Sequence, residues 1–284
     1  MEFSGKLAND KFLPVINPAM LRFKPEVRQT WENSVESITA FIDGTAKMSE
    51  IPYKNYIGIT DRNQALKYIQ EAIDHPNEYV GVDSETTALY PRDGYVLGIS
   101  LSYRLDHGAY IHSDVIDEEV TAKFQELFNK KKVVFHNAKF DIAFLTYHFG
   151  FKFPNFEDTM LMHYALDERT GTHGLKKLAI QYTIYGEYEE ELTTWVKEYC
   201  KKTGILKSYF TWDKIPFDIM KTYAAIDPAV TLILFSKFLG PLKKNEKLWK
   251  VYREILIPGT MFVIDLQNNG IPFDAERLKM AQDV

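Results

Sequence analysis

Two carboxylates stand close together in this sequence at the end of a short apolar segment. Asp83 and Glu85 lie two residues apart, where the predicted strand over 79–83 ends. Side chains two positions apart in a strand point to the same face of a sheet, so the two acids would be neighbours. Neighbouring carboxylates repel each other unless a cation lies between them, which makes the pair a candidate cation site. The alternative is that strand ends meet solvent and that these acids only add solubility.

A third acid, Asp141, lies one turn into a predicted helix. The segment 135–141 runs from a strand into that helix, and Asn137 at the junction is a natural N-cap. Asp141 falls on the same side of the helix as the cap, and its apolar neighbours predict a position close to the core. The alternative is that a helix favours acids near its positive N-terminus whatever their function.

A phenol and a fourth acid share one face of a later helix. Tyr223 and Asp227 are four residues apart, which stacks their side chains on that face. Pro228 follows at once, so Asp227 is also a natural cap for a new helix over 228–239. Either the chain kinks at Pro228 or two helices meet there.

The elements around these residues predict an α/β fold. Asp93-Gly94 and the turn 106–108 suit antiparallel hairpins, and helices alternate with strands after them, so a mixed sheet with flanking helices is expected. The predicted elements are, in order, a helix over 61–74 capped by Asp61, strands over 79–83, 96–103 and 108–112, a helix over 117–130, a strand over 133–135, a helix over 137–149 ended by Gly150, and mostly helix to about 239.

The two flanks of this unit differ from it. Residues 1–55 show no sustained period and are expected to form an N-terminal extension or small appendage with one helix over about 29–41. Residues 56–240 form the predicted main domain. Residues 241–284 are read as the start of a further domain, with one long helix over 243–266, a turn at 268–270 and a new element from 271.

The composition is that of an ordinary globular protein and excludes several classes. The chain has 284 residues, of which 45% are hydrophobic and 26% charged. Its single cysteine, Cys200, excludes an internal disulfide, and no Cys/His cluster has zinc-ligand spacing. No apolar run approaches the roughly 18 residues of a membrane span, and no signal peptide opens the chain. A cytoplasmic protein that does not bind membranes is expected.

The charge balance is slightly acidic. There are 34 Lys and Arg against 39 Asp and Glu, for a net charge of -5. A protein that coats duplex nucleic acid by charge alone is usually basic. Local basic patches at 130–132, 176–177 and 201–202 either contact a polyanion or are ordinary solvated surface.

Taken in order, these motifs resemble a known family. The strings VDSETTAL at 82–89, HNAKFD at 136–141 and YAAIDPAVT at 223–231 are similar to those of the DEDDy 3′-5′ exonucleases, the DnaQ-like branch of the ribonuclease H fold. EDTMLMHY at 157–164 and THGLKKLA at 172–179 also look like that family. The resemblance is greatest to the proofreading domain of family A DNA polymerases. It covers about residues 56–240, and the segment 252–274 is similar to the entry into a polymerase thumb.

The resemblance implies a fold, a metal site and a set of residue roles. The fold is a ribonuclease H-like mixed sheet, with three antiparallel strands plus parallel strands and flanking helices. Two Mg²⁺ or Mn²⁺ ions would serve hydrolysis of a phosphodiester. The implied metal ligands are Asp83, Glu85, Asp141 and Asp227, Tyr223 would orient the attacking water, and Thr86, Leu89 and Asn137 would contact the substrate.

The implied substrate is a single-stranded or frayed DNA 3′ end, shortened in the 3′-5′ direction as proofreading for a polymerase domain in the same longer chain. No polymerase activity is expected from these 284 residues alone. The expected setting is the cytoplasm of a bacterium or of a virus-infected bacterial cell. Two alternatives stay open: an RNA-trimming nuclease of the same family, and a non-catalytic nucleic-acid-binding module of the same fold.

Overall fold

The protein is built on one six-stranded mixed sheet. The computed structural model describes residues 15, 17–23, 28–43, 51–186, 188–271 and 274–282. The strand order is β1-β4-β3-β2-β5-β6, with β2–β3 and β3–β4 antiparallel and the three other pairs parallel. This confirms the predicted α/β class. The strands are β1 (Tyr56–Ile59), β2 (Tyr79–Thr86), β3 (Val96–Ser102), β4 (Gly108–His112), β5 (Lys132–Phe135) and β6 (Phe156–Asp158), of which β1 and β6 were not predicted.

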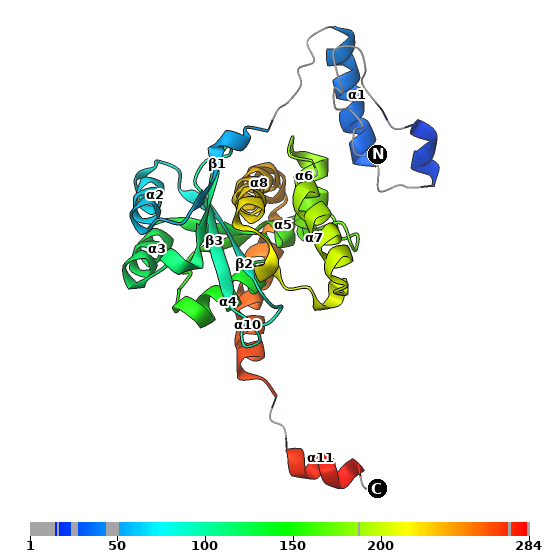
Figure 1. Cartoon of the computed structure of the whole chain (residues 1–284). Coiled ribbons are helices and arrows are strands. Elements are labelled where there is room, and N and C mark those ends of the chain that lie inside the picture. The colour runs from blue at the N-terminus through cyan, green and yellow to red at the C-terminus, as the bar shows by residue number, and fades with distance from the viewer. Residues whose placement is uncertain are drawn as a thin grey trace.

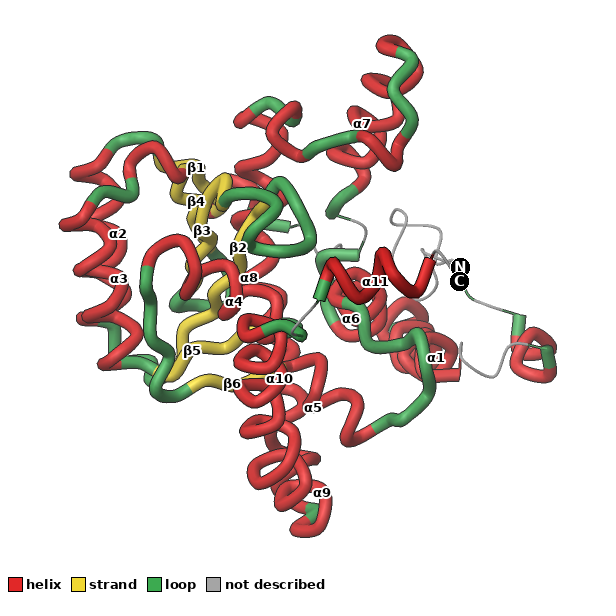
Figure 2. The backbone as a smooth tube through the Cα atoms, turned by 90° about the horizontal axis from the view of Figure 1, so that it is seen from below, coloured by secondary structure: helices red, strands yellow, loops and turns green. Residues whose placement is uncertain are grey.

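Helices cover both faces of the sheet. In Figures 1 and 2, α2 and α3 lie together on one face and α8 lies across the other, with α5, α6 and α7 packed against α8. The helices are α1 (Arg28–Ile42), α2 (Arg62–Asp74), α3 (Glu118–Lys130), α4 (Ala138–Phe149), α5 (Thr159–Leu166), α6 (Leu175–Tyr182), α7 (Glu190–Thr203), α8 (Phe217–Lys244), α9 (Glu246–Val251), α10 (Ile257–Asn269) and α11 (Ala275–Gln282).

Side-chain caps explain why several helices begin where the sequence predicted. The Asp61 carboxylate accepts a hydrogen bond from the Gln64 amide at the start of α2, at 2.8 Å. Asp117 does the same for α3 through the amide of Val120, at 3.0 Å. Such caps satisfy amides that have no partner inside the helix. Gly150 ends α4 with a φ of 71°, a conformation that glycine adopts without strain.

The long helix α8 corrects two predictions. It runs without interruption through Pro228, so two helices do not meet there and Asp227 caps no new helix. A proline inside a helix removes one hydrogen bond, but close packing on the sheet compensates. Two glycines allow that packing: a Cβ on Gly81 would lie 2.2 Å from the Pro228 carbonyl oxygen, and one on Gly108 would lie 2.0 Å from that of Ala225.

The same helix corrects the expectation that no run is apolar enough for a membrane. By length and composition, Phe217–Lys244 is able to cross one. In this structure 67% of its most apolar window is buried inside the protein, where it contacts strands β1 to β5. Its apolarity is therefore accounted for by its position as the core helix of the domain.

The C-terminal part differs from the single helix predicted over 243–266. Helix α8 ends at Lys244, and the Asn245 side chain caps α9 through the Leu248 amide at 3.3 Å. A π-helical turn, Tyr252–Leu256, then leads into α10, which ends at Asn269 and has Gly270 as its C-cap. Pro272 and Phe273, in the element expected from 271, lie outside the described residues, as do 1–14, 16, 24–27 and 44–50 of the extension expected over 1–55. The predicted helix over 29–41 is present as α1, which stands apart from the sheet in Figure 1.

Candidate active site

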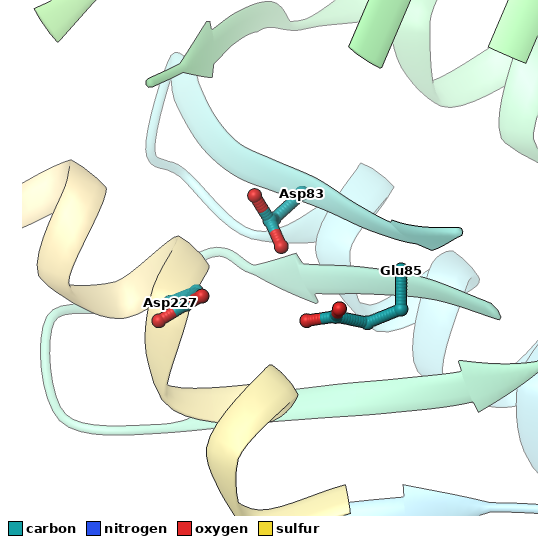
Figure 3. A group of neighbouring side chains, drawn as sticks. All are labelled: Asp83, Glu85 and Asp227. Atoms are coloured by element: carbon teal, nitrogen blue, oxygen red, sulfur yellow. The ribbon is translucent and has the colours of Figure 1, made fainter. Parts of the chain in front are cut away.

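Three carboxylates converge where β2 meets α8. One oxygen each from Asp83, Glu85 and Asp227 lies within 4.8 Å of the other two. Asp83 and Glu85 share the face of β2 that carries Gly81, the glycine against Pro228, and this alternation turns both acids toward α8. Figure 3 shows the three side chains directed into one shared space from the strand and the helix. The structure thus brings together three of the four predicted metal ligands.

The fourth predicted ligand, Asp141, lies beside this cluster and is held by the chain. Its Oδ1 accepts hydrogen bonds from the Ser84 amide at 2.9 Å and from the Ser84 hydroxyl at 2.7 Å. Pairing between β2 and β5 ends at Gly81, so the Ser84 amide beyond it needs this other acceptor. Asp141 is 2% exposed, which confirms the predicted position near the core.

All eight predicted site residues line one cavity of about 390 Å³. The walls of the cavity come from β2, the loop after it, the start of α4, the segment before α8, and α8 itself. Leu89 stands at its edge and is 78% exposed, whereas the Thr86 hydroxyl is tied to the Ala88 carbonyl at 2.9 Å. The predicted residues in its wall are Asp83, Glu85, Thr86, Leu89, Asn137, Asp141, Tyr223 and Asp227.

Asn137 occupies the N-cap position of α4 as predicted, but its side chain does not cap the helix. Asn137 has a left-handed backbone with a φ of 70°, which asparagine tolerates, and its side chain makes no capping hydrogen bond. Asp158 supplies the cap, because its carboxylate accepts from the amides of Asn137 at 3.2 Å and Ala138 at 2.8 Å. The Asn137 side chain therefore lines the cavity without holding the helix.

Two aromatic residues in the cavity wall were missed in the sequence. Phe210 and Trp212 lie in the segment before α8, which was predicted to be mostly helical and contains only the single turns Lys207–Tyr209 and Trp212–Lys214. They face the cavity together with Leu89 and Phe140. Aromatic residues in a stretch without helical periodicity were the one signal that pointed to them.

A lysine and a tyrosine at the cluster were also missed. The Lys176 ammonium donates to Asp227 Oδ1 and, at 2.7 Å, to the Tyr188 hydroxyl, and that hydroxyl also donates to Asp227 Oδ1. Lys176 had been grouped with Lys177 as a surface patch, but only Lys177 faces away, donating to the Gly171 carbonyl at 2.7 Å. Nothing in the spacing of two adjacent lysines indicates which one points inward.

Of the other basic patches, the three lysines at 130–132 all bind acceptors of the protein itself. Lys130 pairs with Glu126 at 2.7 Å and Lys132 with Glu78 at 2.6 Å, while Lys131 donates to the Asn77 carbonyl at 2.9 Å. These interactions fit an ordinary solvated surface better than a polyanion site.

Burial and the charges of neighbouring acids raise the pKa of several carboxylates in the site. Burial raises the pKa of Glu85 to about 8, and the charge of Asp227 adds to this effect. Burial raises the pKa of Asp141 to about 7 against the opposing Ser84 hydrogen bonds, and it raises that of Asp83 well above its usual range. A cation would relieve the same repulsion. Four carboxylates offer only hard oxygen donors, a set that fits Mg²⁺ or Mn²⁺ and not zinc or copper.

Tyr223 reaches the cluster from α8, one turn before Asp227. Its ring stacks on Tyr188, with centroids 6.1 Å apart, and packs against Trp212 at 5.9 Å. Burial and the nearby charges of Asp227 and Glu85 raise the Tyr223 pKa well above its usual value. The hydroxyl therefore stays protonated at neutral pH and is a donor or acceptor of hydrogen bonds, not a base.

Comparisons with known proteins identify what this arrangement is similar to. A family model described as 3′-5′ exonuclease matches residues 56–243. A DNA polymerase of Escherichia phage T5 is 43% identical over 290 residues, which cover 99% of this chain and 33% of that protein. A DNA polymerase I of Borreliella burgdorferi is 26% identical and is covered to 25%. The chain thus spans a third or less of the length of these curated relatives.

Solved structures share the fold at low sequence identity. The POL domain of Pol1 from M. smegmatis, in complex with DNA primer-template and dNTP, superposes with a TM-score of 0.54 and 15% identity, covering 80% of this chain and 34% of that one. RNase D of Trypanosoma brucei gives a TM-score of 0.51 with 13% identity over 66% of each chain. Both likenesses support the mixed sheet with flanking helices that the sequence predicted.

Proposed function

The chain belongs to the 3′-5′ exonuclease family, and from that premise we propose that it removes nucleotides from single-stranded or frayed DNA 3′ ends as the proofreading part of a family A DNA polymerase. The observation that carries the proposal is the convergence of Asp83, Glu85 and Asp227 in a cavity that Asp141 and Tyr223 also line. Five groups from three distant segments of the sequence meet in one place, and their chemistry suits phosphodiester hydrolysis.

The carboxylates are proposed to hold two Mg²⁺ or Mn²⁺ ions. When bound, such ions make a water acidic enough to attack near neutral pH and stabilise the charge on the departing 3′-oxygen. The protein supplies the ligands in advance: Asp83 and Glu85 are fixed by β2, Asp141 by Ser84, and Asp227 by α8. The protonated Tyr223 hydroxyl is placed to orient the attacking water by a hydrogen bond.

The cavity walls suit an unpaired end. Leu89 and Phe140 lie in the same cavity as Phe210 and Trp212, so a terminal base entering between them would be packed between apolar groups. Every base has a face that packs on such groups, and this kind of contact is therefore indifferent to sequence. A paired terminus would have to separate first, and a mismatched one separates at lower cost, which would favour removal of errors.

The polymerase context is supported by the relatives. The chain matches proteins named DNA polymerase over a third or less of their length, and the phage T5 protein is 43% identical across nearly the whole chain. We therefore propose that a polymerase domain in the same longer chain delivers the 3′ end. Relatives from phages and bacteria fit the cytoplasm of a bacterial or phage-infected cell.

The test is hydrolysis of a 5′-labelled single-stranded DNA with Mg²⁺ by the wild-type chain and by the double variant Asp83→Ala, Glu85→Ala. The double variant should lose at least about 10³-fold in rate, since it removes the metal ligands of β2, and it should still unfold cooperatively. Glu118→Ala, an exposed acid at the start of α3, is the control and should digest at the wild-type rate. A double variant as active as the control would show that the site is elsewhere.

The same assay separates the two alternatives. A matched RNA oligonucleotide measures sugar preference, and hydrolysis of RNA faster than of DNA would replace the DNA proposal with an RNA-trimming one. A wild-type chain that retains the labelled DNA on a filter but releases no nucleotide in Mg²⁺ or Mn²⁺ would be a binding module without catalysis.

A further inference from the structure

Lys176 occupies a position in the site that the proposed hydrolysis does not use. It lies in the first turn of α6, and its side chain, 23% exposed, reaches the cluster at Asp227. The ammonium lies 4.1 Å from the ring centroid of Tyr223 and 4.3 Å from that of Tyr188, so two aromatic faces hold it. Its hydrogen bonds to Asp227 and to the Tyr188 hydroxyl fix its remaining freedom.

This lysine is the cation that the chain itself gives to the cluster. Among the ion pairs of the described residues, Lys176–Asp227 is the pair that involves one of the converging acids. Its charge lowers the pKa of Asp83 and of Glu85, against the larger effects that raise them. One ammonium against several carboxylates leaves the cluster undercompensated, so a divalent ion is still attracted.

We propose that Lys176 is a built-in counter-ion that holds Asp227 in the metal-free protein and must be displaced before Asp227 becomes a metal ligand, so that Lys176 sets the affinity of the site for divalent ions. The inference rests on the proposed function, because it takes Asp227 as a ligand. It adds a competition: the ammonium and the metal ion share one carboxylate, and binding one weakens binding of the other.

The side chain is able to make way. A lysine has four rotatable side-chain bonds and is charged at its end only, so it can leave Asp227 without moving α6. Its partial exposure gives it a route toward solvent. Tyr188, whose hydroxyl donates to the same Asp227 oxygen, has to give up that hydrogen bond as well. Two hydrogen-bond donors, one of them charged, therefore have to leave the Asp227 carboxylate before a metal ion binds it.

Lys177 provides a matched control. It is the next residue on the same helix and carries the same charge, but its ammonium donates to the Gly171 carbonyl, outside the cluster. Lys176→Met and Lys177→Met therefore change the net charge of the protein equally, and only the first removes a cation from Asp227.

The experiment is calorimetric titration of the 284-residue chain with Mn²⁺. Lys176→Met should bind Mn²⁺ about tenfold more tightly than wild type, within the usual range for two coupled ligands, and Lys177→Met should stay within about twofold of it. In EDTA, Lys176→Met should also unfold at a lower temperature than Lys177→Met, because Asp227 has lost its charged partner, and saturating Mn²⁺ should close that gap.

A second variant keeps the proposal testable if Lys176→Met does not fold. Tyr188→Phe keeps the ring and removes the other donor to Asp227, and it should tighten Mn²⁺ binding about two- to threefold. Unchanged or weaker Mn²⁺ binding in the folded variants, with a wild-type chain that binds Mn²⁺, would overturn the counter-ion role alone. A wild-type chain that does not bind Mn²⁺ would overturn the proposed metal site and this inference with it.

Discussion

Two pairs of acids lie at the carboxyl ends of strands β2 and β6, on the same edge of the parallel part of the sheet. Glu85 and Glu157 are similarly buried, at 7% and 6% exposure. The pairs differ in their partners. Asp158 accepts from four backbone amides, and Glu157 from the Tyr252 hydroxyl at 2.7 Å and from Arg253 at 3.0 Å. No described residue donates a hydrogen bond to the side chain of Asp83 or Glu85.

The difference separates a structural acid from a functional one. Where the chain fills the lone pairs of a carboxylate, burial of the charge is compensated and the residue fixes the fold. Where the chain crowds carboxylates and leaves them without donors, the arrangement costs stability and attracts a cation. By this measure the acids of β6 are structural, whereas those of β2 have the environment expected of the proposed metal ligands.

The largest effect should come from breaking the structural pair. Asp158→Ala removes the acceptor of the amides that open α4 and α5, and we expect the free energy of unfolding in EDTA to fall by about 3–5 kcal/mol. Urea denaturation followed by circular dichroism measures it. Asp83→Ala is the comparison and should not destabilise the metal-free protein. A loss below about 1 kcal/mol in Asp158→Ala would remove the distinction between the two strands.

A smaller effect should appear when the β2 pair, Asp83 and Glu85, loses a charge. The pKa of Glu85 is raised from 4.5 to about 8, so its contribution to metal-free stability is complete below pH 4.5 and is lost as the pH rises through about 8. Glu85→Gln cannot ionise and should escape this loss. Above pH 8 in EDTA the variant should therefore unfold at a higher temperature than wild type, by about 2–4 °C for each kcal/mol recovered.

Scanning fluorimetry in EDTA between pH 5 and about 9 records both curves across this window. The two proteins should approach each other at the acid end, where Glu85 is protonated, and separate at the alkaline end. Parallel curves over the whole window would mean that Glu85 ionises without cost and that the crowding of the β2 pair has no energetic consequence.

The elements that the sequence located best are those whose signals are local. Asp61 and Asp117 cap α2 and α3 through their own side chains, and the apolar segments of β2, β3 and β4 are five to eight residues long. The strands β1 and β6 have four and three residues, too few for a pattern to emerge. They form because neighbouring strands offer them pairing partners. Those strands are distant in the sequence, so the residues of β1 and β6 alone do not reveal them.

The acids of the site could be predicted from the sequence, and the residues around them could not. Spacing placed Asp83 and Glu85 on one face, whereas the approach of Asp227 depends on α8 continuing through Pro228 against Gly81. That continuation is decided by packing, which overrides the local preference of proline. For the same reason nothing local marked Lys176 as the lysine that turns inward.

The smallest effect is expected from Tyr252→Phe, which tests the β6 pair, Glu157 and Asp158. Tyr252→Phe keeps the ring against Trp249 and removes one hydroxyl, which donates to Glu157 and accepts from the Asp158 amide at 3.0 Å. Leaving those groups without a partner should cost about 1–2 kcal/mol of unfolding free energy. Tyr147→Phe, at a tyrosine that is 55% exposed, is the control and should cost nothing measurable.

Metal binding is the second measurement on Tyr252→Phe. Its hydroxyl forms hydrogen bonds with Glu157 and Asp158, both in β6, so the dissociation constant for Mn²⁺ should match wild type within about twofold even though the fold is weaker. A metal affinity that fell together with stability would mean that the two acid pairs are coupled. The route would be α4, because Asp158 binds an amide at the start of that helix and Asp141 lies on the same helix.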